Sequence, residues 1–288
     1  MTKVFPPDHD DILRHFAVTA AHFAAASGIA DVWRVVQSDG RAAALKIYHN
    51  RNMQDEAPGF DLLRALDGHG AVRVLAQKEG AVLLEWLEGP PLSALTLAGQ
   101  DDAACAILLE TVRRMHAIPV APIASLPTLE KRFRALISAT FTADCPGRVA
   151  DSLRFACATA ERLLPSQSEP RPLHGDLHHD NIKDSARGYL AFDAKGVFGD
   201  PLYEVANAFQ NPLGADDFVL DTQTITKRAA IWAEGLRTTA PHLLDWAIAH
   251  AGLSLAWHTD GVIGPALRPH IGKLESLITV RATYDQGA

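Results

Sequence analysis

The sequence predicts an α+β protein with a small, β-rich N-lobe (residues 1–87) and a larger, mostly helical C-lobe (residues 88–288). Three observations predict this plan. Pairs of short apolar runs split by polar turns dominate the first third, helical periodicity dominates from residue 92 onward, and the breaker Glu88-Gly89-Pro90-Pro91 separates the two patterns. With 288 residues, 48% of them hydrophobic, the chain is long enough for two lobes with cores of their own.

In the N-lobe we expect one amphipathic helix, two hairpins and a second helix between the hairpins. Apolar side chains recur among many alanines over residues 8–26, which favours a helix that ends at Ser27-Gly28. The second helix has Pro58 in its first turn, where proline is tolerated. The expected strands are residues 31–36, 42–48, 71–76 and 81–87, and the second helix is residues 58–66.

In the C-lobe, helices are expected over residues 101–115, 129–141 and 148–164, where apolar residues recur at helical spacing. Residues 171–200 interrupt this pattern with short apolar pieces, hairpin-like turns and many polar side chains. Helices resume after Pro201. The apolar stretch 243–257 is shorter than a bilayer requires and is expected to be a buried helix.

Composition and charge exclude several classes of protein. A net charge of −7 argues against a nucleic-acid partner and is compatible with a cationic ligand. Three cysteines without a close pair favour a reducing, cytoplasmic location over a disulfide framework. Asp8, Asp10, Asp11 and Arg14 precede any apolar run, so we expect no secretion signal. We also expect no membrane partner.

The most informative segment is residues 173–181, with the sequence LHGDLHHDN. It keeps the frame of the kinase catalytic loop, His-Arg-Asp-Leu-x-x-x-Asn, with Gly175 in place of arginine. In that chemistry Asp176 would accept the proton of a hydroxyl, and Asn181 would reach back to a magnesium ion on the phosphates of ATP. Twelve residues later an apolar run ends in Asp193, which predicts a second metal-holding group at the same place.

Lys46 lies in the middle of the apolar run 42–48 and resembles the lysine of the Val-Ala-Ile-Lys strand in kinases. A lysine among apolar residues is costly to bury unless an anion neutralises it, which a triphosphate would do. Its acidic partner is expected from the following helix. Glu56 is the first choice, and Asp61 is an alternative because Pro58 suggests that the helix starts after Glu56.

Two further patterns are weaker. Residues 26–31 contain one glycine instead of a Gly-x-Gly-x-x-Gly loop, so Ser27 and Gly28 are candidates for contacting phosphates through the backbone. His174 and His178 are four residues apart, as in some zinc sites, but the segment offers no obvious third ligand. Free histidines in a polar loop are the simpler interpretation.

At residues 174–181 the sequence resembles the His-Gly-Asp-Leu-His-x-x-Asn signature of the aminoglycoside phosphotransferase superfamily, which shares the protein-kinase-like fold. Residues 192–206 (FDAKGVFGDPLYEVA) are similar to the aminoglycoside/hydroxyurea antibiotic resistance kinases, a group that includes streptomycin 6-phosphotransferases. Residues 70–75, 83–85 and 244–250 also resemble that group. The resemblance covers most of the chain and is strongest over residues 171–211.

The resemblance implies an ATP-dependent phosphotransferase that acts on a hydroxyl of an aminoglycoside such as streptomycin or of a hydroxyurea-type antibiotic. It implies Asp176 as the catalytic base, Asn181 and Asp193 as Mg²⁺ ligands, and Lys46 at the α/β-phosphates. Residues 85–87, from Glu85 to Leu87, would bind adenine through the backbone. A metabolic kinase for a sugar or amino alcohol, and a catalytically silent nucleotide-binding protein, are the alternatives.

A small acceptor also follows from the short distance between Asp193 and the next helix, because protein kinases place a long activation loop there. The cations of an aminoglycoside would need carboxylates. Candidates near or after the catalytic region are Asp200, Glu204, Asp216 and Asp217. The tryptophans at helical positions, Trp232, Trp246 and Trp257, are expected to belong to the core.

Overall fold

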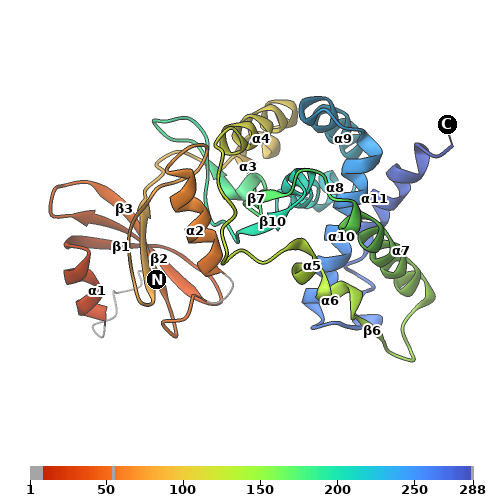
Figure 1. Ribbon diagram of the computed structural model, residues 1–288, viewed down its shortest axis with the longest axis horizontal. Helices are drawn as coiled ribbons and strands as arrows, with labels where there is room; N and C mark the ends of the chain where they lie inside the picture. Colours follow the sequence, from red (N-terminus) through yellow and green to blue (C-terminus); the bar gives the residue numbers. More distant parts are fainter. Residues whose placement is uncertain (1–8, 54–55, 287–288) are drawn as a thin grey trace.

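The computed structural model describes residues 9–53 and 56–286. A five-stranded antiparallel sheet and a mostly helical region lie at opposite ends of the long axis of the molecule (Figure 1). This is the α+β arrangement that the sequence predicts. Asp8, the first residue of the expected N-terminal helix, lies outside the described residues, as do the other residues before it.

The sheet has the strand order β1-β2-β3-β5-β4. Both predicted hairpins are confirmed, as is the helix between them. The strands are β1 (Val18–Ala26), β2 (Ala30–Gln37), β3 (Ala42–Tyr48), β4 (Val74–Lys78) and β5 (Ala81–Glu85), and the helices of this part are α1 (Asp10–His15) and α2 (Ala57–Leu66).

The helix expected over residues 8–26 is wrong for its second half. Helix α1 ends at His15, and β1 pairs antiparallel with β2 over the rest of that segment. Alanine favours helices locally, but pairing with a strand overrides that weak preference. Phe23 packs edge-on against Trp33 with ring centroids 5.4 Å apart, which holds β1 on the sheet. The small alanines at its end are needed for the site described below.

The two faces of the sheet pack against different cores. Leu45, Ile47 and Trp33 belong to a small core that also contains Ile12 of α1. Tyr48 of the same strand packs with Phe60 of α2 in the main core. Because side chains alternate along a strand, Lys46 shares the face of Tyr48 and points toward α2 and the helical region.

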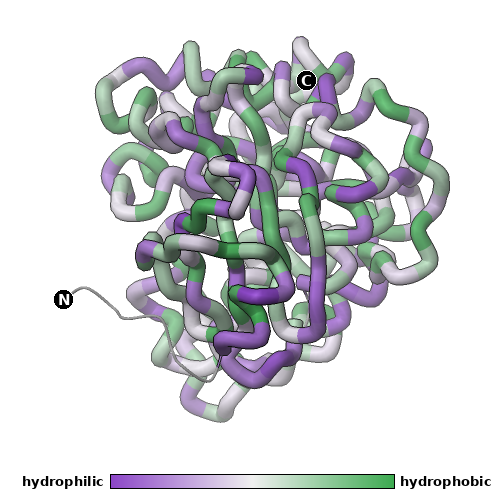
Figure 2. The backbone as a smooth tube through the Cα atoms, turned by 90° about the vertical axis from the view of Figure 1, so that its left-hand side faces the viewer, coloured by the Kyte–Doolittle hydropathy of each residue, from purple (hydrophilic) through white to green (hydrophobic). Residues whose placement is uncertain are grey.

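The helical region is organised around α10 (Ala240–His258), which is buried over most of its length and packs against α7, α9 and α11. Its nearly uniform hydrophobicity is typical of a buried helix, and Figure 2 marks the apolar residues along the chain. No helix among the described residues is long and apolar enough to cross a membrane. The other helices are α3 (Ser93–Leu97), α4 (Asp101–His116), α5 (Leu129–Arg132), α6 (Arg134–Ile137), α7 (Gly147–Leu163), α8 (Asp216–Val219), α9 (Thr222–Leu236) and α11 (Gly272–Thr283).

The helix expected over residues 129–141 is interrupted. Its N-terminal part forms α5 and α6, and the chain then leaves the helix to form β6 (Thr140–Phe141). This short strand pairs in parallel with β11 (Val262–Ile263), from the segment after α10. Pairing with a strand 122 residues further along the chain therefore ends the helix, which local periodicity could not indicate.

Residues 171–200 form two short antiparallel strand pairs, one of them a hairpin, where the sequence predicts hairpin-like turns. Strand β7 (Arg171–Leu173) pairs with β10 (Val197–Gly199), and β8 (Ile182–Lys183) pairs with β9 (Leu190–Ala191). Between them, residues 174–181 and 192–196 form two loops that face the N-terminal sheet. Short 3₁₀ helices complete this part: η3 (Leu164–Ser166), η4 (His179–Asn181), η5 (Pro201–Val205), η6 (Asn207–Gln210) and η7 (Pro265–Leu267).

Candidate active site

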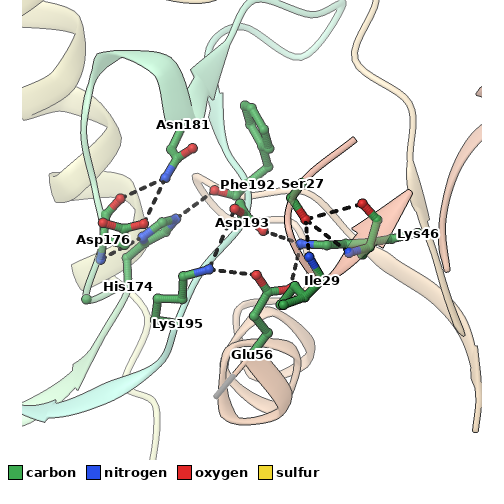
Figure 3. A network of polar contacts seen from close by, with 12 residues as sticks. Ser27, Ile29, Lys46, Glu56, His174, Asp176, Asn181, Phe192, Asp193 and Lys195 are labelled. Atoms are coloured by element: carbon green, nitrogen blue, oxygen red, sulfur yellow. Dashed lines mark hydrogen bonds and ion pairs between the residues drawn. The ribbon is translucent and has the colours of Figure 1, made fainter. Parts of the chain in front are cut away.

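Lys46 and two carboxylates join the sheet to the helical region (Figure 3). Its ammonium lies 2.6 Å from Oε2 of Glu56 and 2.6 Å from Oδ1 of Asp193. The side chain of Lys46 is 9% exposed, so these carboxylates supply the neutralisation that a buried lysine requires. Asp193 comes from the loop after β9, 147 residues away in sequence. The strand lysine and the second predicted metal ligand are therefore in direct contact.

Of the two acidic residues considered for Lys46, Glu56 makes the ion pair and Asp61 does not. Helix α2 starts at Ala57, so Glu56 occupies the position just before the helix and still points at Lys46. Asp61 instead lies 2.9 Å from Nη1 of Arg64 and accepts a hydrogen bond of 2.6 Å from the hydroxyl of Ser125. The alternative partner is therefore wrong.

Two residues that the sequence analysis missed complete this cluster. The hydroxyl of Tyr48 donates a 2.6 Å hydrogen bond to Oε2 of Glu56. Lys195 Nζ lies 2.7 Å from Oε1 of Glu56 and 3.8 Å from Oδ2 of Asp193. The signal for Lys195 was its position two residues after Asp193. The signal for Tyr48 was its position on the same strand face as Lys46.

Both carboxylates of the cluster remain ionised. Burial and the charge of Asp193 raise the pKa of Glu56, but Lys46 and Lys195 outweigh them and hold that pKa below its ordinary value. Burial also raises the pKa of Asp193, and the same two lysines bring it below its ordinary value. Burial lowers the pKa of Lys195, but the two carboxylates raise it overall. Two ammonium groups thus balance two carboxylates.

Asp176 is held at the opposite side of the site by two asparagines. Its Oδ1 accepts a 2.8 Å hydrogen bond from Nδ2 of Asn207. Nδ2 of Asn181 donates to the backbone carbonyl of Asp176 at 2.9 Å and to Oδ2 at 3.4 Å. These bonds fix the orientation of the carboxylate as a hydroxyl-binding base would require. Asn207 was missed, because an asparagine 31 residues downstream carries no spacing signal.

The backbone conformation at Gly175 explains why this loop has glycine where protein kinases have arginine. Its φ of +78° lies in the left-handed region that side chains rarely adopt. A Cβ at this position would also lie 3.1 Å from the side chain of Val197 on β10. Nη2 of Arg132 on α5 binds the carbonyl of Gly175 at 2.9 Å, so a guanidinium contacts this loop from another element.

Glu204 holds the loop from behind. Its carboxylate accepts hydrogen bonds from the backbone N–H groups of His174 at 3.2 Å and Gly175 at 3.3 Å, and from the His116 ring at 3.0 Å. Burial raises the pKa of Glu204, but the contact with His116 and the nearby His174 lower it overall. Glu204 is 2% exposed, so it is not available to a ligand. The expectation that it could bind an acceptor is wrong.

The two loops of the site are joined by further bonds around His174. Its Nε2 donates to the carbonyl of Phe192 at 3.0 Å, and its Nδ1 accepts from the backbone N–H of Asp176 at 3.3 Å. The backbone N–H groups of Lys195 and Gly196 donate to the carbonyl of His174, both at 3.0 Å. Burial lowers the pKa of His174, so the ring is neutral. Asp176 and Asp193 are thereby fixed relative to one another.

The histidines do not form a zinc site. Both ring nitrogens of His174 are bonded within the protein, and Nδ1 of His178 accepts from the backbone N–H of Asp180 at 3.2 Å. Within residues 9–53 and 56–286, no group of three or more histidine, cysteine, aspartate or glutamate side chains could hold a metal ion. The simpler interpretation of free histidines in a polar loop is also wrong, because His174, His178 and His179 are buried.

Asn181 and Asp193 suit magnesium once phosphates are present. The amide nitrogen of Asn181 is used by Asp176, which leaves its oxygen as a donor atom toward a cation. Asp193 supplies a carboxylate whose present partners are the two lysines. Mg²⁺ typically takes one or two protein oxygens and completes its shell with phosphate oxygens and water. Asn181 and Asp193 would provide the protein oxygens of such a shell.

A cavity of about 370 Å³ opens beside Lys46 and Asp193. Its lining is mostly apolar and includes the charged residues Lys46, Glu85, Lys183 and Asp193, so it suits a planar base followed by phosphates. The C-terminal end of β1, whose side chains are small, forms part of the cavity wall, which explains the run of alanines there. The lining residues are Ala24, Ala25, Ala26, Ser27, Val32, Ala44, Lys46, Phe60, Val72, Leu84, Glu85, Trp86, Leu87, Lys183, Phe192 and Asp193.

The remaining candidates for nucleotide binding differ in their placement. Ser27 lines the cavity, and its Oγ accepts a 3.1 Å hydrogen bond from the backbone N–H of Ala30 in the turn after β1. Gly28 stands in the same turn and is not among the lining residues. Glu85 and Leu87 line the cavity, but the carboxylate of Glu85 points to Arg187, whose Nε lies 2.9 Å from Oε1. Leu87 is buried.

The other carboxylates considered for binding an acceptor differ in their exposure. Asp200 is 1% exposed and accepts hydrogen bonds from the backbone N–H groups of Leu202 and Ser168, so the expectation of an acceptor role is wrong. Asp216 and Asp217 are exposed, with Asp216 3.1 Å from Nζ of Lys273.

Two of the three tryptophans, Trp232 and Trp246, are fully buried, as expected. Trp257 is 41% exposed, and the guanidinium of Arg132 lies 4.7 Å from its ring centroid. The expectation of a core position is wrong for Trp257, because it stands near the exposed C-terminal end of α10.

Comparison with known proteins gives consistent matches along the chain. The chain is 36% identical over 229 residues to a streptomycin 3″-kinase from Klebsiella pneumoniae, covering 77% of this chain and 82% of that protein. It is 27% identical over 251 residues to a streptomycin 6-kinase from Streptomyces griseus, covering 84% and 79% respectively.

Solved structures show the same fold at low sequence identity. The aminoglycoside phosphotransferase APH(4)-Ia, in a ternary complex with ADP and hygromycin B, matches with a TM-score of 0.62 and 14% identity over 97% of this chain and 98% of that chain. A choline/ethanolamine kinase family protein from Mesorhizobium loti matches with a TM-score of 0.66 and 12% identity over 95% and 93%. A family model described as aminoglycoside/hydroxyurea antibiotic resistance kinase matches residues 15–261. The chain therefore belongs to the aminoglycoside/hydroxyurea antibiotic resistance kinase family.

Proposed function

We propose that this kinase transfers the γ-phosphoryl group of ATP to one hydroxyl of streptomycin or a closely related aminoglycoside. The observation that carries the proposal is the convergence of Lys46, Asp193, Asn181 and Asp176 in one network of polar contacts (Figure 3). Positioning and electrostatic stabilisation supply most of the catalysis in phosphoryl transfer, and these side chains are the types that this chemistry uses.

In this proposal the cavity beside Lys46 binds the nucleotide. The apolar walls take the adenine ring, and the backbone of residues 85–87 provides its hydrogen bonds, with the Glu85 side chain tied to Arg187. Lys46 contacts the α/β-phosphates and exchanges its present contact with Asp193 for them. The backbone N–H of Ser27 donates to the carbonyl of Ala30, so Gly28 is the residue of this turn whose N–H we assign to the phosphates.

Asp176 is the proposed base. Its carboxylate accepts the proton of the acceptor hydroxyl as the oxygen attacks the γ-phosphorus, while the bond to the β–γ bridging oxygen breaks and ADP leaves. Asn207 and Asn181 hold the carboxylate in place during this step. Asn181 and Asp193 would hold Mg²⁺, which neutralises phosphate charge when it is bound.

Streptomycin is favoured as the acceptor because two sequence relatives carry that substrate in their names. The 36% identity to the 3″-kinase against 27% to the 6-kinase favours the 3″-hydroxyl. The cationic groups of such an acceptor require carboxylates, and of the four candidates Asp216 and Asp217 are exposed. A metabolic kinase and a catalytically silent protein are the alternatives that the experiment below separates.

We also propose a lobe boundary at residues 87/88 and a cytoplasmic location. Immediately after that boundary, the backbone N–H of Gly89 donates to the carbonyl of Asp184 at 3.1 Å, so the chain joins the helical region there. The three cysteines are free thiols, which a reducing compartment preserves.

The test is ATP consumption by the purified protein with streptomycin, other aminoglycosides, hydroxyurea and a panel of sugars and amino alcohols. We expect turnover with streptomycin and a single phosphorylated product, whose position is then read by NMR. Turnover with a sugar or amino alcohol alone would replace the acceptor assignment. Binding of Mg-ATP without turnover of any acceptor would favour the silent protein.

A further inference from the structure

Lys195 has no role in the proposed reaction, although it lies inside the site. Its ammonium bridges Oε1 of Glu56 and Oδ2 of Asp193, on the side of the cluster that faces His174 and Asp176 (Figure 3). The side chain of Lys195 is 26% exposed, against 9% for Lys46. Lys195 therefore has better access to the open part of the cleft than the lysine assigned to the phosphates.

The backbone that carries Lys195 is fixed on both sides. The N–H groups of Lys195 and Gly196 donate to the carbonyl of His174, two residues before Asp176. Gly196 has a φ of +70°, and a Cβ there would lie 2.7 Å from the carbonyl oxygen of Pro58 in α2. The base of the Lys195 side chain is thus held between the loop of Asp176 and the start of α2. Its four-carbon stem can turn about a rigid base.

Glu56 keeps its neutralising partners when Lys195 turns away. Its Oε2 is bound by Lys46 at 2.6 Å and by the hydroxyl of Tyr48 at 2.6 Å, whereas Lys195 binds Oε1. The four charged groups of the cluster balance before a nucleotide arrives. A triphosphate adds several negative charges to this partly buried site, and ammonium groups already present within the cleft can offset part of that charge beside Mg²⁺ without new ordering.

We propose that Lys195 is a catalytic residue whose ammonium leaves Glu56 and binds the non-bridging oxygens of the γ-phosphoryl group during its transfer. This inference rests on the proposed phosphotransfer. The bond from phosphorus to the acceptor oxygen forms, the bond to the β–γ bridging oxygen breaks, and the hydroxyl proton goes to Asp176. Lys195 stays protonated throughout and supplies charge stabilisation where negative charge spreads over the equatorial oxygens.

A contact that strengthens in the transition state raises kcat more than it lowers KM. Loss of one preorganised donor of this kind typically reduces kcat by about 10²–10³. We therefore expect Lys195→Met to lower kcat by roughly that factor, with the KM for ATP and the affinity for ADP within about threefold of wild type. Lys195→Arg keeps the charge and recovers part of the loss.

The deciding measurement is calorimetric binding of ADP with magnesium, alone and with aluminium fluoride, which mimics the phosphoryl group in transfer. We expect wild type to bind the mimic more tightly than ADP alone and Lys195→Met to lose most of that gain. Lys227→Met is the matched control, because Lys227 is a surface lysine on α9 paired with Asp102. Thermal melting of Lys195→Met and Lys195→Gln establishes that the variants fold.

The proposal is overturned when Lys195→Met keeps kcat within threefold of wild type. It is also overturned when the affinities for ADP and for the mimic fall by one common factor, because Lys195 would then act in nucleotide binding or structure alone. The same comparison is run on the slow hydrolysis of ATP without an acceptor. If wild type hydrolyses ATP but does not phosphorylate streptomycin, the acceptor assignment is contradicted, and the effect of Lys195→Met can still be measured on hydrolysis. If wild type transfers the phosphoryl group neither to streptomycin nor to water, both the acceptor assignment and the role of Lys195 are contradicted.

Discussion

Gly59 offers the sharpest structural test of how the site is assembled. It lies in the first turn of α2, three residues after Glu56, and a Cβ at this position would be 1.7 Å from the carbonyl oxygen of Ala194. Helix α2 and the loop that carries Asp193 and Lys195 therefore touch through backbone atoms. We expect Gly59→Ala to force them apart and to weaken the contacts of Glu56 with the lysines.

The expected loss of unfolding free energy depends on how far the atoms around residue 59 can move. A normal contact needs about 3.4 Å, so one backbone must move by more than 1 Å, and the 194–196 loop is anchored to His174. Overpacking of this kind costs about 1–3 kcal/mol of unfolding free energy, and the better helix propensity of alanine returns at most about 1 kcal/mol. We expect a net loss of about 1–2 kcal/mol and a fall in melting temperature of roughly 2–8 °C.

The assay is chemical and thermal unfolding of Gly59→Ala beside Gly147→Ala. Gly147 is the first residue of α7, and a Cβ there meets nothing within 4 Å. The control is expected to be neutral or slightly stabilising, because alanine replaces glycine in a helix without a clash. We also expect weaker ATP binding for Gly59→Ala. Equal stability of Gly59→Ala and wild type, with unchanged ATP binding, would refute the proposed contact between α2 and the loop.

Three further predictions concern the charged groups. Asp176→Asn is expected to reduce kcat by about 10²–10⁴ while the Kd for ATP stays within about threefold, measured by steady-state kinetics and calorimetry. Glu56→Gln leaves the buried Lys46 and the partly exposed Lys195 with Asp193 as their remaining carboxylate and is expected to cost about 3–5 kcal/mol of unfolding free energy, measured by denaturant titration. Burial lowers the pKa of both His179 and His250 to about 3, so between about pH 6.5 and 3 the unfolded chain binds more protons at these rings. Each ring is therefore expected to reduce unfolding free energy by up to about 1.4 kcal/mol per pH unit below pH 6.5, measured by unfolding at several pH values.

Each of these three predictions has a control variant or a result that would contradict it. Glu88→Gln alters an exposed carboxylate paired with Arg34 and is expected to change stability little. Near-normal turnover of Asp176→Asn would exclude Asp176 as the base. A slope of stability against pH that is unchanged between wild type and His250→Asn would show that this ring does not titrate as described.

The sequence predicted most of the elements that position the site, because their signals are local. Hairpins marked by apolar runs and glycine turns formed as expected, and so did α2 with its early proline. The sequence predicts a helix for residues 18–26, where a strand forms, because alanine-rich local preference does not report the long pairing with β2. A strand there also places small side chains beside the nucleotide cavity, which a periodicity count cannot register.

Residues with a fixed offset from a motif were predictable, and residues brought in by tertiary packing were not. Asp176, Asn181 and Asp193 follow from spacing within one segment. Asn207 reaches Asp176 from a 3₁₀ helix 31 residues away, and no spacing rule connects the two. Glu204 looked like a free carboxylate for an acceptor, although it is consumed by backbone N–H groups of the catalytic loop.

The most direct measurement of the central claim is a crystal structure with magnesium, a non-hydrolysable ATP analogue and streptomycin. We expect the γ-phosphate between Lys46 and Asp176, with one streptomycin hydroxyl about 2.6–3.2 Å from the Asp176 carboxylate. A nucleotide bound away from Lys46, or a streptomycin with every hydroxyl beyond reach of Asp176, would contradict the account.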